Sequence, residues 1–341
     1  MKFKSSRKRW VLACACLLAL TLRGAIVLGQ EKSEPISLIE GISSPDFGYV
    51  TSYLARAKGF FKSEGLDVKI VIMRSSVSVP ALVTGEVQFA VHGSAMTAAL
   101  KGAPLKAVFF TYNTSTMQFM VRREIRKPED LKGKVVAIAS PGGSQDQATR
   151  LILNKLGLDP GRDVKLLAVG SAKARVIGME TGQIAGSANN LDIAAELVKK
   201  GYRIMANSAE VYPVPWAGFA ANDRWLRANP ALAKKWLRAQ VKALLFIRAH
   251  PDEAAHVTAK ELKLDTDVAR EAIGQAIDFI NPKDPGGFTE TGMRSLIQYT
   301  AERVGIEPRK VKIADVAEVT LLREVQQELG IQCRGGYLCN P

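Results

Sequence analysis

The chain has 341 residues, of which 47% are hydrophobic and 23% are charged. This balance is typical of a globular protein and excludes wholesale disorder, collagen and coiled-coil arrays. At roughly 100–200 residues per domain, the length predicts two lobes. The formal net charge of +14 invites a nucleic-acid partner. Its basic residues are scattered and have few aromatic neighbours, so we predict that no nucleic acid is bound.

The first thirty residues have the pattern of a secretory signal peptide. Basic residues lie between Lys2 and Arg9, an apolar run follows over 11–22, and small residues precede Gly29. The apolar run is shorter than the ~20 residues that a membrane-spanning helix needs. We therefore predict a signal peptide over 1–29, cleaved near Gly29, and a periplasmic mature protein. Retention of this segment as an anchor is the alternative.

Short apolar runs alternate with helical patterns through the first two thirds of the chain. Strands are predicted, in chain order, at 36–39, 68–73, 89–91, 106–110, 135–139, 164–168 and 182–185. Helices are predicted at 49–58, 79–84, 95–101, 145–156, 174–180 and 191–200, with a turn at 59–65. After Asp223 the pattern is mostly helical, over 230–249, 252–261, 267–279 and 289–304. The alternation predicts an α/β fold with mainly parallel sheets.

The terminal segment, 331–341, holds the two cysteines that remain after the signal peptide is removed. Cys333 and Cys339 lie six residues apart around a Gly-Gly pair. In an oxidising compartment this spacing indicates one small disulfide. A metal site is the weaker interpretation, because it needs two more ligands and no His lies nearby. A tail with two free thiols is the other alternative.

Catalytic motifs are absent from the sequence. Among its three His, His250 and His256 are six apart, which is not the HExxH spacing of a zinc site. There is no GxSxG, GxxxxGKS/T or GxGxxG motif. We therefore predict a protein that is not an enzyme and has no metal and no cofactor.

Four small polar loops instead follow predicted strands. They cover 43–46, 74–76, 93–94 and 140–144 and are rich in Ser and Gly. In open α/β sheets, ligands bind at the carboxyl ends of the strands, where helix N-termini offer unpaired N–H groups. Helix capping explains any one of these loops. Four at corresponding positions predict a ligand cleft.

The stretch 53–68, YLARAKGFFKSEGLDV, is similar to a signature of periplasmic substrate-binding proteins. That signature, A-x-x-x-G-F-F-x-x-E-G-L-D-V, is typical of the family that binds nitrate, sulfonates and taurine and includes NMT1-like thiamine-pyrimidine relatives. The resemblance continues through ALVTGEV at 81–87, DLKGK at 130–134 and the loop at 141–144. It covers about 35–330.

The resemblance implies a two-lobe periplasmic binding protein fold of type II, with a hinge of two crossover strands. We expect the first lobe to comprise 35–112 and 216–330, and the second lobe to comprise 113–215. Crossovers are expected near 110–120 and 216–221. The implied function is capture of a small solute and its delivery to an ABC permease with its ATPase, by a protein that acts as a monomer.

Two departures leave the solute open. The chain has Gln88 and Ala185 where the family usually has Asp. It also lacks the clustered cysteines of the eukaryotic pyrimidine-synthesising relatives. A thiamine-pyrimidine-synthase-like enzyme and a ligand-sensing ectodomain stay as alternatives. The solute is expected to be anionic or planar.

The candidate ligand-binding residues are polar or aromatic side chains in the loops and near the crossovers: Ser43, Ser44, Asp46, Phe47, Tyr49, Ser76, His92, Ser94, Tyr112, Asn113, Gly143, Ser144, Gln145, Asn189, Asn190 and Trp216. For an anionic ligand, we expect the N–H groups of Gly143, Ser144 and Gln145 to hold it. Asp46 would pair with a cationic ligand or cap the following helix.

Three of these candidates are large aromatic residues. Tyr49, Tyr112 and Trp216 would either stack on a planar ligand or pack inside a lobe.

Overall fold

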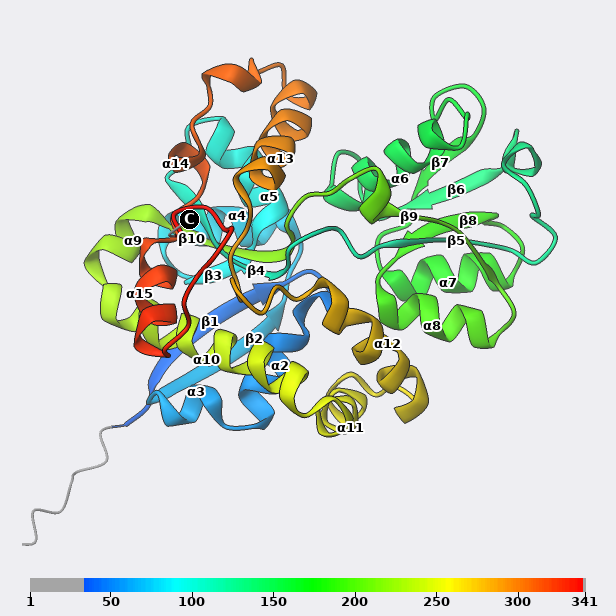
Figure 1. Ribbon diagram of the computed structural model, residues 1–341. Helices are drawn as coiled ribbons and strands as arrows, with labels where there is room; N and C mark the ends of the chain where they lie inside the picture. The colour runs from blue at the N-terminus through cyan, green and yellow to red at the C-terminus, as the bar shows by residue number, and fades with distance from the viewer. Residues whose placement is uncertain (1–33, 340–341) are drawn as a thin grey trace, which may run out of the picture. The chain divides into compact units, whose positions relative to one another are not determined.

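A computed structural model describes residues 34–339, so the predicted signal peptide lies outside the described residues (Figure 1). The chain forms two five-stranded sheets. The first has the order β2-β1-β3-β10-β4. Its strands are β1 (Ile36–Ile42), β2 (Leu66–Ile72), β3 (Phe89–Val91), β4 (Leu105–Tyr112) and β10 (Trp216–Asn222).

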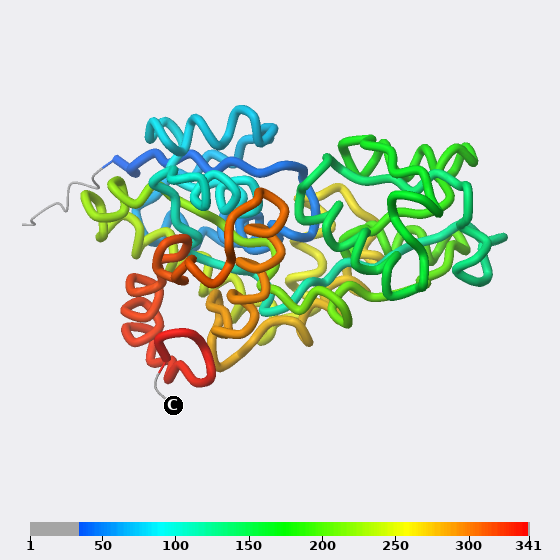
Figure 2. The backbone as a smooth tube through the Cα atoms, turned by 90° about the horizontal axis from the view of Figure 1, so that it is seen from above, coloured from blue at the N-terminus to red at the C-terminus, as the bar shows by residue number. Residues whose placement is uncertain are grey.

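The second sheet has the order β7-β6-β8-β5-β9. Its strands are β5 (Gln118–Val121), β6 (Val135–Ile138), β7 (Lys165–Ala168), β8 (Gly186–Asn189) and β9 (Arg203–Asn207). Three helices belong to the same stretch of chain, α6 (Ser144–Lys155), α7 (Ala172–Glu180) and α8 (Leu191–Lys199). All of them lie in the continuous green segment of Figures 1 and 2.

The remaining helices come from both ends of the described chain, coloured blue to cyan and yellow to red in Figure 2. They are α2 (Val50–Ala57), α3 (Phe60–Ser63), α4 (Ser75–Thr84), α5 (His92–Leu100), α9 (Asp223–Ala228), α10 (Pro230–Ala249), α11 (Pro251–Leu262), α12 (Thr266–Phe279), α13 (Glu290–Arg303), α14 (Ile313–Val316) and α15 (Thr320–Glu328). Within residues 34–339, no helix combines the length and the apolar character needed to cross a membrane.

The prediction of mainly parallel sheets holds for four strands of each sheet, whereas the fifth strand of each runs antiparallel, so that each sheet is mixed. β1 pairs in parallel with β2 and β3, and β6 with β7 and β8. In contrast, β10 is antiparallel to β3 and β4, and β5 is antiparallel to β8 and β9. A connecting helix returns the chain for a parallel strand, whereas β5 and β10 each enter their sheet directly from the other sheet.

The predicted strand at 182–185 is wrong. Gly182 has a φ of 82° and directly follows the end of α7, and the N–H of Ile184 donates to the carbonyl of Gly178 at 2.9 Å. These residues therefore complete the C-terminal turn of a helix, where glycine is favoured because it adopts the left-handed conformation without strain. The strand of this region, β8, begins at Gly186. Likewise, the predicted turn at 59–65 contains the short helix α3.

Two connections carry the chain between the sheets. The first follows β4 over 113–117, and the second runs from β9 through a 3-10 turn, Ser208–Glu210, to β10. They lie side by side: the buried hydroxyls of Ser115 and Ser208 are 2.6 Å apart, and the N–H of Ser208 donates to the carbonyl of Met117 at 2.8 Å. Because these bonds join the two connections to each other, both are expected to bend as one unit.

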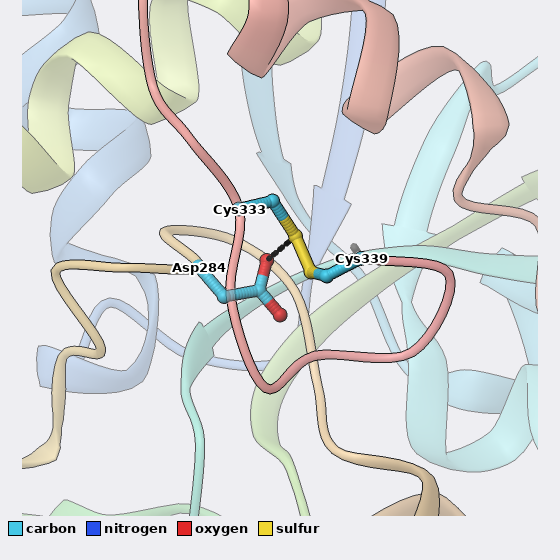
Figure 3. A group of neighbouring side chains, drawn as sticks. All are labelled: Asp284, Cys333 and Cys339. Carbon is cyan, nitrogen blue, oxygen red and sulfur yellow. Dashed lines mark hydrogen bonds between the residues drawn. A yellow bond between two sulfur atoms is a disulfide. The ribbon is translucent and has the colours of Figure 1, made fainter. Parts of the chain in front are cut away.

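The C-terminal segment is held against the helices by a buried ion pair. A disulfide joins Cys333 and Cys339 beside Asp284 (Figure 3). The buried carboxylate of Asp284 accepts hydrogen bonds from Arg323 of α15 and, at 2.9 Å, from Gln326. The Arg323 guanidinium also donates to the carbonyl of Tyr337 at 2.6 Å. These bonds tie the end of the described chain to α15.

Candidate ligand-binding site

The two sheets are linked at the carboxyl ends of β1 and β8. Asp46 follows β1, and Asn190 follows β8. The side-chain amide of Asn190 donates to Asp46 Oδ1 at 2.9 Å. The carboxyl ends of parallel strands are where ligands bind in open α/β sheets, so this contact marks the centre of the candidate site.

Asp46 has the capping role that the sequence suggested, and it also contacts the second sheet. It caps the 3-10 turn Phe47–Tyr49, since its Oδ1 accepts from the N–H of Gly48 at 2.9 Å, and Oδ2 accepts from the Ser44 hydroxyl. It also meets the second sheet through Asn190. Burial raises the pKa of Asp46, and the charge of Arg175 opposes that rise. The carboxylate is therefore a buried acceptor between the sheets.

Two charged residues on helices of the second sheet's chain segment interact electrostatically with Asp46, and the sequence analysis missed both. Asp192 lies in the first turn of α8 and Arg175 in α7, and both are buried. Burial and the nearby charge of Asp46 raise the pKa of Asp192 to about 7. Burial lowers the pKa of Arg175 to about 10, although Asp46 favours its charged form. The site thus holds two carboxyl groups and one guanidinium.

Three side chains at the end of β8 carry oxygens that no other described residue satisfies. They are Oδ1 of Asn189, Asn190 and Asp192. Asn189 is fully buried, and its Nδ2 donates to the carbonyl of Ser187 at 2.9 Å. Oδ1 of Asn113, on the first connection, is also buried without a partner in the described chain.

His92 begins α5 on the side of the first sheet and is buried. Its Nδ1 accepts from the N–H of Gly218 at 3.1 Å, and its ring packs edge-on against Phe110 at 4.8 Å. Burial lowers the pKa of His92 to about 4, so the ring is neutral at pH 7. Nδ1 also lies 3.2 Å from the carbonyl oxygen of Gly218, and Nε2 has no partner within residues 34–339.

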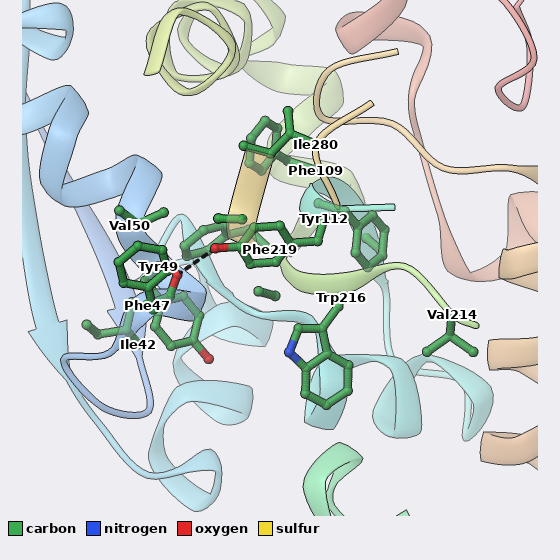
Figure 4. Close-up of a cluster of buried hydrophobic side chains, with 14 of the residues drawn as sticks. Ile42, Phe47, Tyr49, Val50, Phe109, Tyr112, Val214, Trp216, Phe219 and Ile280 are labelled. Atoms are coloured by element: carbon green, nitrogen blue, oxygen red, sulfur yellow. Dashed lines mark hydrogen bonds between the residues drawn. The ribbon is translucent and has the colours of Figure 1, made fainter. Parts of the chain in front are cut away.

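The aromatic candidates pack within the first sheet and its crossover (Figure 4). The hydroxyl of Tyr112 donates to the carbonyl of Phe47 at 3.1 Å. Tyr49 packs edge-on against Phe219 at 5.7 Å, and its hydroxyl lies 3.0 Å from that of Ser43. Trp216, which is 6% exposed, begins β10. These rings form an apolar wall at the Phe47–Tyr49 turn that Asp46 caps.

The loop at 140–144 is largely satisfied by its own residues. The N–H of Gly143 donates to the carbonyl of Ser140 at 3.2 Å, and the N–H of Gly142 donates to Asp146 Oδ2 at 2.7 Å. The side chain of Gln145 accepts from the N–H of Ala139 at 2.7 Å and donates to the carbonyl of Ala188 at 2.9 Å. Gln145 therefore joins β6 to β8.

The remaining candidates lie at helix N-termini. A Cβ on Gly93 would lie 2.7 Å from the Ser144 hydroxyl, so the start of α5 faces the start of α6. Ser94 is half-buried on α5, whereas Ser76 is exposed at the start of α4. A cavity of about 780 Å³ lies beside the 140–144 loop, between α6 and α13, and its lining includes Asp146, Arg150, Tyr299 and Arg303.

A cluster that could hold a metal lies apart from these residues. Ligand atoms of Asp284, Cys333 and Cys339 lie within 4.8 Å of one another. Both sulfurs are joined in the disulfide, and Arg323 pairs with the carboxylate. The three residues therefore do not fit a metal while the disulfide is intact.

Comparisons with known proteins agree on a binding-protein fold. The putative binding protein YtlA of Bacillus subtilis is 26% identical over 272 residues, covering 76% of this chain and 80% of YtlA. The periplasmic nitrate-binding protein NrtA from Synechocystis PCC 6803 matches with a TM-score of 0.70 at 17% identity, covering 87% of this chain and 89% of NrtA. The periplasmic aliphatic sulphonate binding protein SsuA from Escherichia coli matches with a TM-score of 0.66 at 18% identity, covering 84% of this chain and 93% of SsuA.

Two mixed sheets joined by two connections define the class: a type II periplasmic binding protein fold with two lobes. We call the parts built on the first and second sheets the first and second lobes. Residues 47–254 match the family model described as NMT1/THI5 like, so the chain belongs to the NMT1/THI5-like family. The family resemblance and the fold class expected from the sequence are confirmed.

Proposed function

We propose that the protein is an exported solute-binding protein of an ABC importer. It captures a small organic solute between its lobes in the periplasm and delivers that solute to a permease and its ATPase. It acts as a monomer and performs no chemistry on the solute. The bond from Asn190 to Asp46 is the observation that carries the proposal, because it joins the lobes at the strand ends where solutes bind.

The hinge and the unsatisfied polar atoms support the same mechanism. The connections bonded at Ser115 and Ser208 allow the lobes to move as two bodies. Asn189 and Asp192 are buried, and their free oxygens need partners. A solute between the lobes supplies those partners and thus favours the closed state, which is the state expected to dock on the permease.

The test uses the solute that copurifies with the protein. The protein is isolated from a periplasmic fraction, and the solute is released by heating and identified by mass spectrometry. Cells lacking the gene are expected to lose uptake of that solute, and the wild-type gene restores uptake only with an intact permease. Retained uptake in the deletion strain contradicts the transport role. Turnover of the solute by the pure protein would instead support the synthase-like alternative.

Export is tested on the same preparation. N-terminal sequencing is expected to begin near Gln30 in soluble protein. Membrane-bound protein that begins at Met1 contradicts cleavage and supports the anchored sensor.

A further inference from the structure

The hydrogen-bonding capacity of the second lobe is unbalanced toward acceptors. The amides of Asn189 and Asn190 have fixed orientations, because their Nδ2 groups donate at 2.9 Å to the carbonyl of Ser187 and to Asp46. Both of these partners only accept, so Oδ1 of each Asn is available as an acceptor. Together with Oδ1 of Asp192, three buried oxygens lack a donor in the described chain, against one buried donor of the same lobe that lacks an acceptor, Nε of Arg175. Buried acceptors without donors destabilise a protein, so a ligand is expected to supply N–H or O–H groups here.

The charges at the site point in the same direction. Asp46, Asp192 and Arg175 are buried and interact electrostatically with one another through Asp46. When both carboxyl groups are ionised they exceed the guanidinium by one negative charge, which in the unliganded protein is offset by a proton that burial keeps on the carboxyl groups. A buried charge without a counter-charge is unfavourable. One positive charge on the solute therefore balances the site.

The start of α6, the most evident anion position in the same lobe, already carries a carboxylate. The N-terminus of α6 attracts negative charge, and the carboxylate of Asp146, in its first turn, accepts from the N–H of Gly142 at 2.7 Å. Arg150 pairs with the other oxygen of Asp146 at 2.7 Å. An oxyanion brought to this helix would meet a carboxylate that is already present.

We propose that the solute is an organic cation that presents several N–H donors on a planar skeleton, such as an amidinium or an aminium-bearing ring. Its donors bind Oδ1 of Asn189, Asn190 and Asp192, its charge is balanced by Asp46 and Asp192, and its ring lies against the wall formed by Tyr112 and Trp216. This inference rests on the proposed solute-binding function and replaces the expectation of an anionic solute.

The first experiment compares three probes of one shape. Benzamidinium, benzamide and benzoate share a planar skeleton but differ in donors and in charge. Binding to the mature protein is measured by calorimetry and thermal shift, with benzenesulfonate and nitrate as further anions. A second series, acetamidinium, acetamide and acetate, is tested in case the site is too narrow to admit a benzene ring. Affinity is expected to fall from amidinium to amide to carboxylate in whichever series binds.

The second experiment compares two buried carboxyl groups. Asp192→Asn is expected to weaken amidinium binding by about 10- to 150-fold, the range of one hydrogen bond to a charged group. Glu40→Gln is the matched control, because Glu40 is a buried carboxyl of the first lobe whose pKa burial also raises to about 7. Glu40 is bonded to Trp236 and Gln240 in the lobe core, so its removal is expected to leave affinity unchanged.

Each outcome decides the proposal. Tighter binding of benzoate, benzenesulfonate or nitrate than of the amidinium overturns the cation assignment but leaves the solute-binding function standing. An equal loss of affinity in Asp192→Asn and Glu40→Gln, or no binding of any amidinium at millimolar concentration, also overturns the assignment. The solute-binding function itself fails only if the copurification and uptake experiment fails.

Discussion

The N-termini of α6 and α8 in the second lobe both carry polar groups that need hydrogen-bond partners. They differ in whether the lobe itself supplies those partners. At α6, the donors of the Gly142 turn are filled by the lobe's own Asp146. At α8, Asn189, Asn190 and Asp192 keep free oxygens. The glycine-rich loop has the sequence expected of an anion site, yet its hydrogen bonds are internal. The site with unsatisfied atoms is the one that contacts the first lobe through Asp46.

The difference teaches that helix N-termini alone do not locate a solute. Every helix start offers N–H groups, and at α6 the first-turn acid Asp146 also binds the N–H of Gly142 just before the helix. What distinguishes the start of α8 is that its polar side chains are buried and oriented by other hydrogen bonds, and that their Oδ1 atoms still lack a hydrogen-bond partner. Substitutions at the two helix starts can therefore distinguish polar groups that stabilise the fold from polar groups that bind the solute.

The largest effect is expected from Asp192→Asn on the pH dependence of stability. In the folded protein the pKa of Asp192 is raised from 3.8 to about 7, so the native state keeps a proton that the unfolded state loses. Stability should therefore fall as pH rises from about 4 to about 7, by up to about 4 kcal/mol from this group. Asp192→Asn removes that contribution, so urea unfolding of the variant should show a smaller fall.

The comparison between variant and wild type removes the titrating groups that do not interact with Asp192. Glu40, whose raised pKa acts in the same direction, and His92, whose lowered pKa acts in the opposite direction, are present in both proteins. Parallel stability curves for the wild type and Asp192→Asn from pH 4 to pH 8 would contradict the burial of this carboxyl group.

A smaller effect is expected from Asp146→Asn at the other helix start. The variant weakens the bonds to Gly142 and Arg150 and is expected to lose about 1 kcal/mol of stability, typical of a helix-terminal acid. Its affinity for benzamidinium should not change. A gain of tenfold or more in affinity for benzoate would show instead that α6 is a solute site that Asp146 blocks.

The smallest effect is expected from Ser144→Ala. Its hydroxyl faces Gly93 of the first lobe, and no oxyanion is placed there in the proposed complex. Both the melting temperature and the affinity for benzamidinium should stay close to wild type. A 10- to 150-fold loss of affinity, the size of the effect of one hydrogen bond to a charged group, would show instead that the solute is held at the start of α6.

Much of the fold was predictable because local signals define it. The helix predicted at 230–249 is observed at those bounds, since Pro230 begins it and Pro251 begins the next helix. In contrast, β5 and β9 went unpredicted, because they are short and pair with each other across some eighty residues of chain. The strand predicted at 182–185 is wrong because Gly182, which follows the end of a helix, was interpreted as the start of a strand.

The site was predictable only in part. Asp46 and Asn190 were expected from their loops, and the structure joins them. Asp192 and Arg175 were missed because a first-turn acid and a helical Arg usually face solvent, and their burial depends on how the lobes pack. The sequence Asn-Asn-Leu-Asp, which begins at the last residue of β8, was the available signal. Ser76, selected for its loop, is exposed.

The most direct test of this account is a crystal structure of the mature protein with benzamidinium. We expect one molecule between the lobes, with amidinium nitrogens within hydrogen-bond distance of Oδ1 of Asp192 and of Asn189 or Asn190. A molecule bound instead at the start of α6, next to Gly143 and Ser144, would contradict the assignment of the solute to the α8 edge.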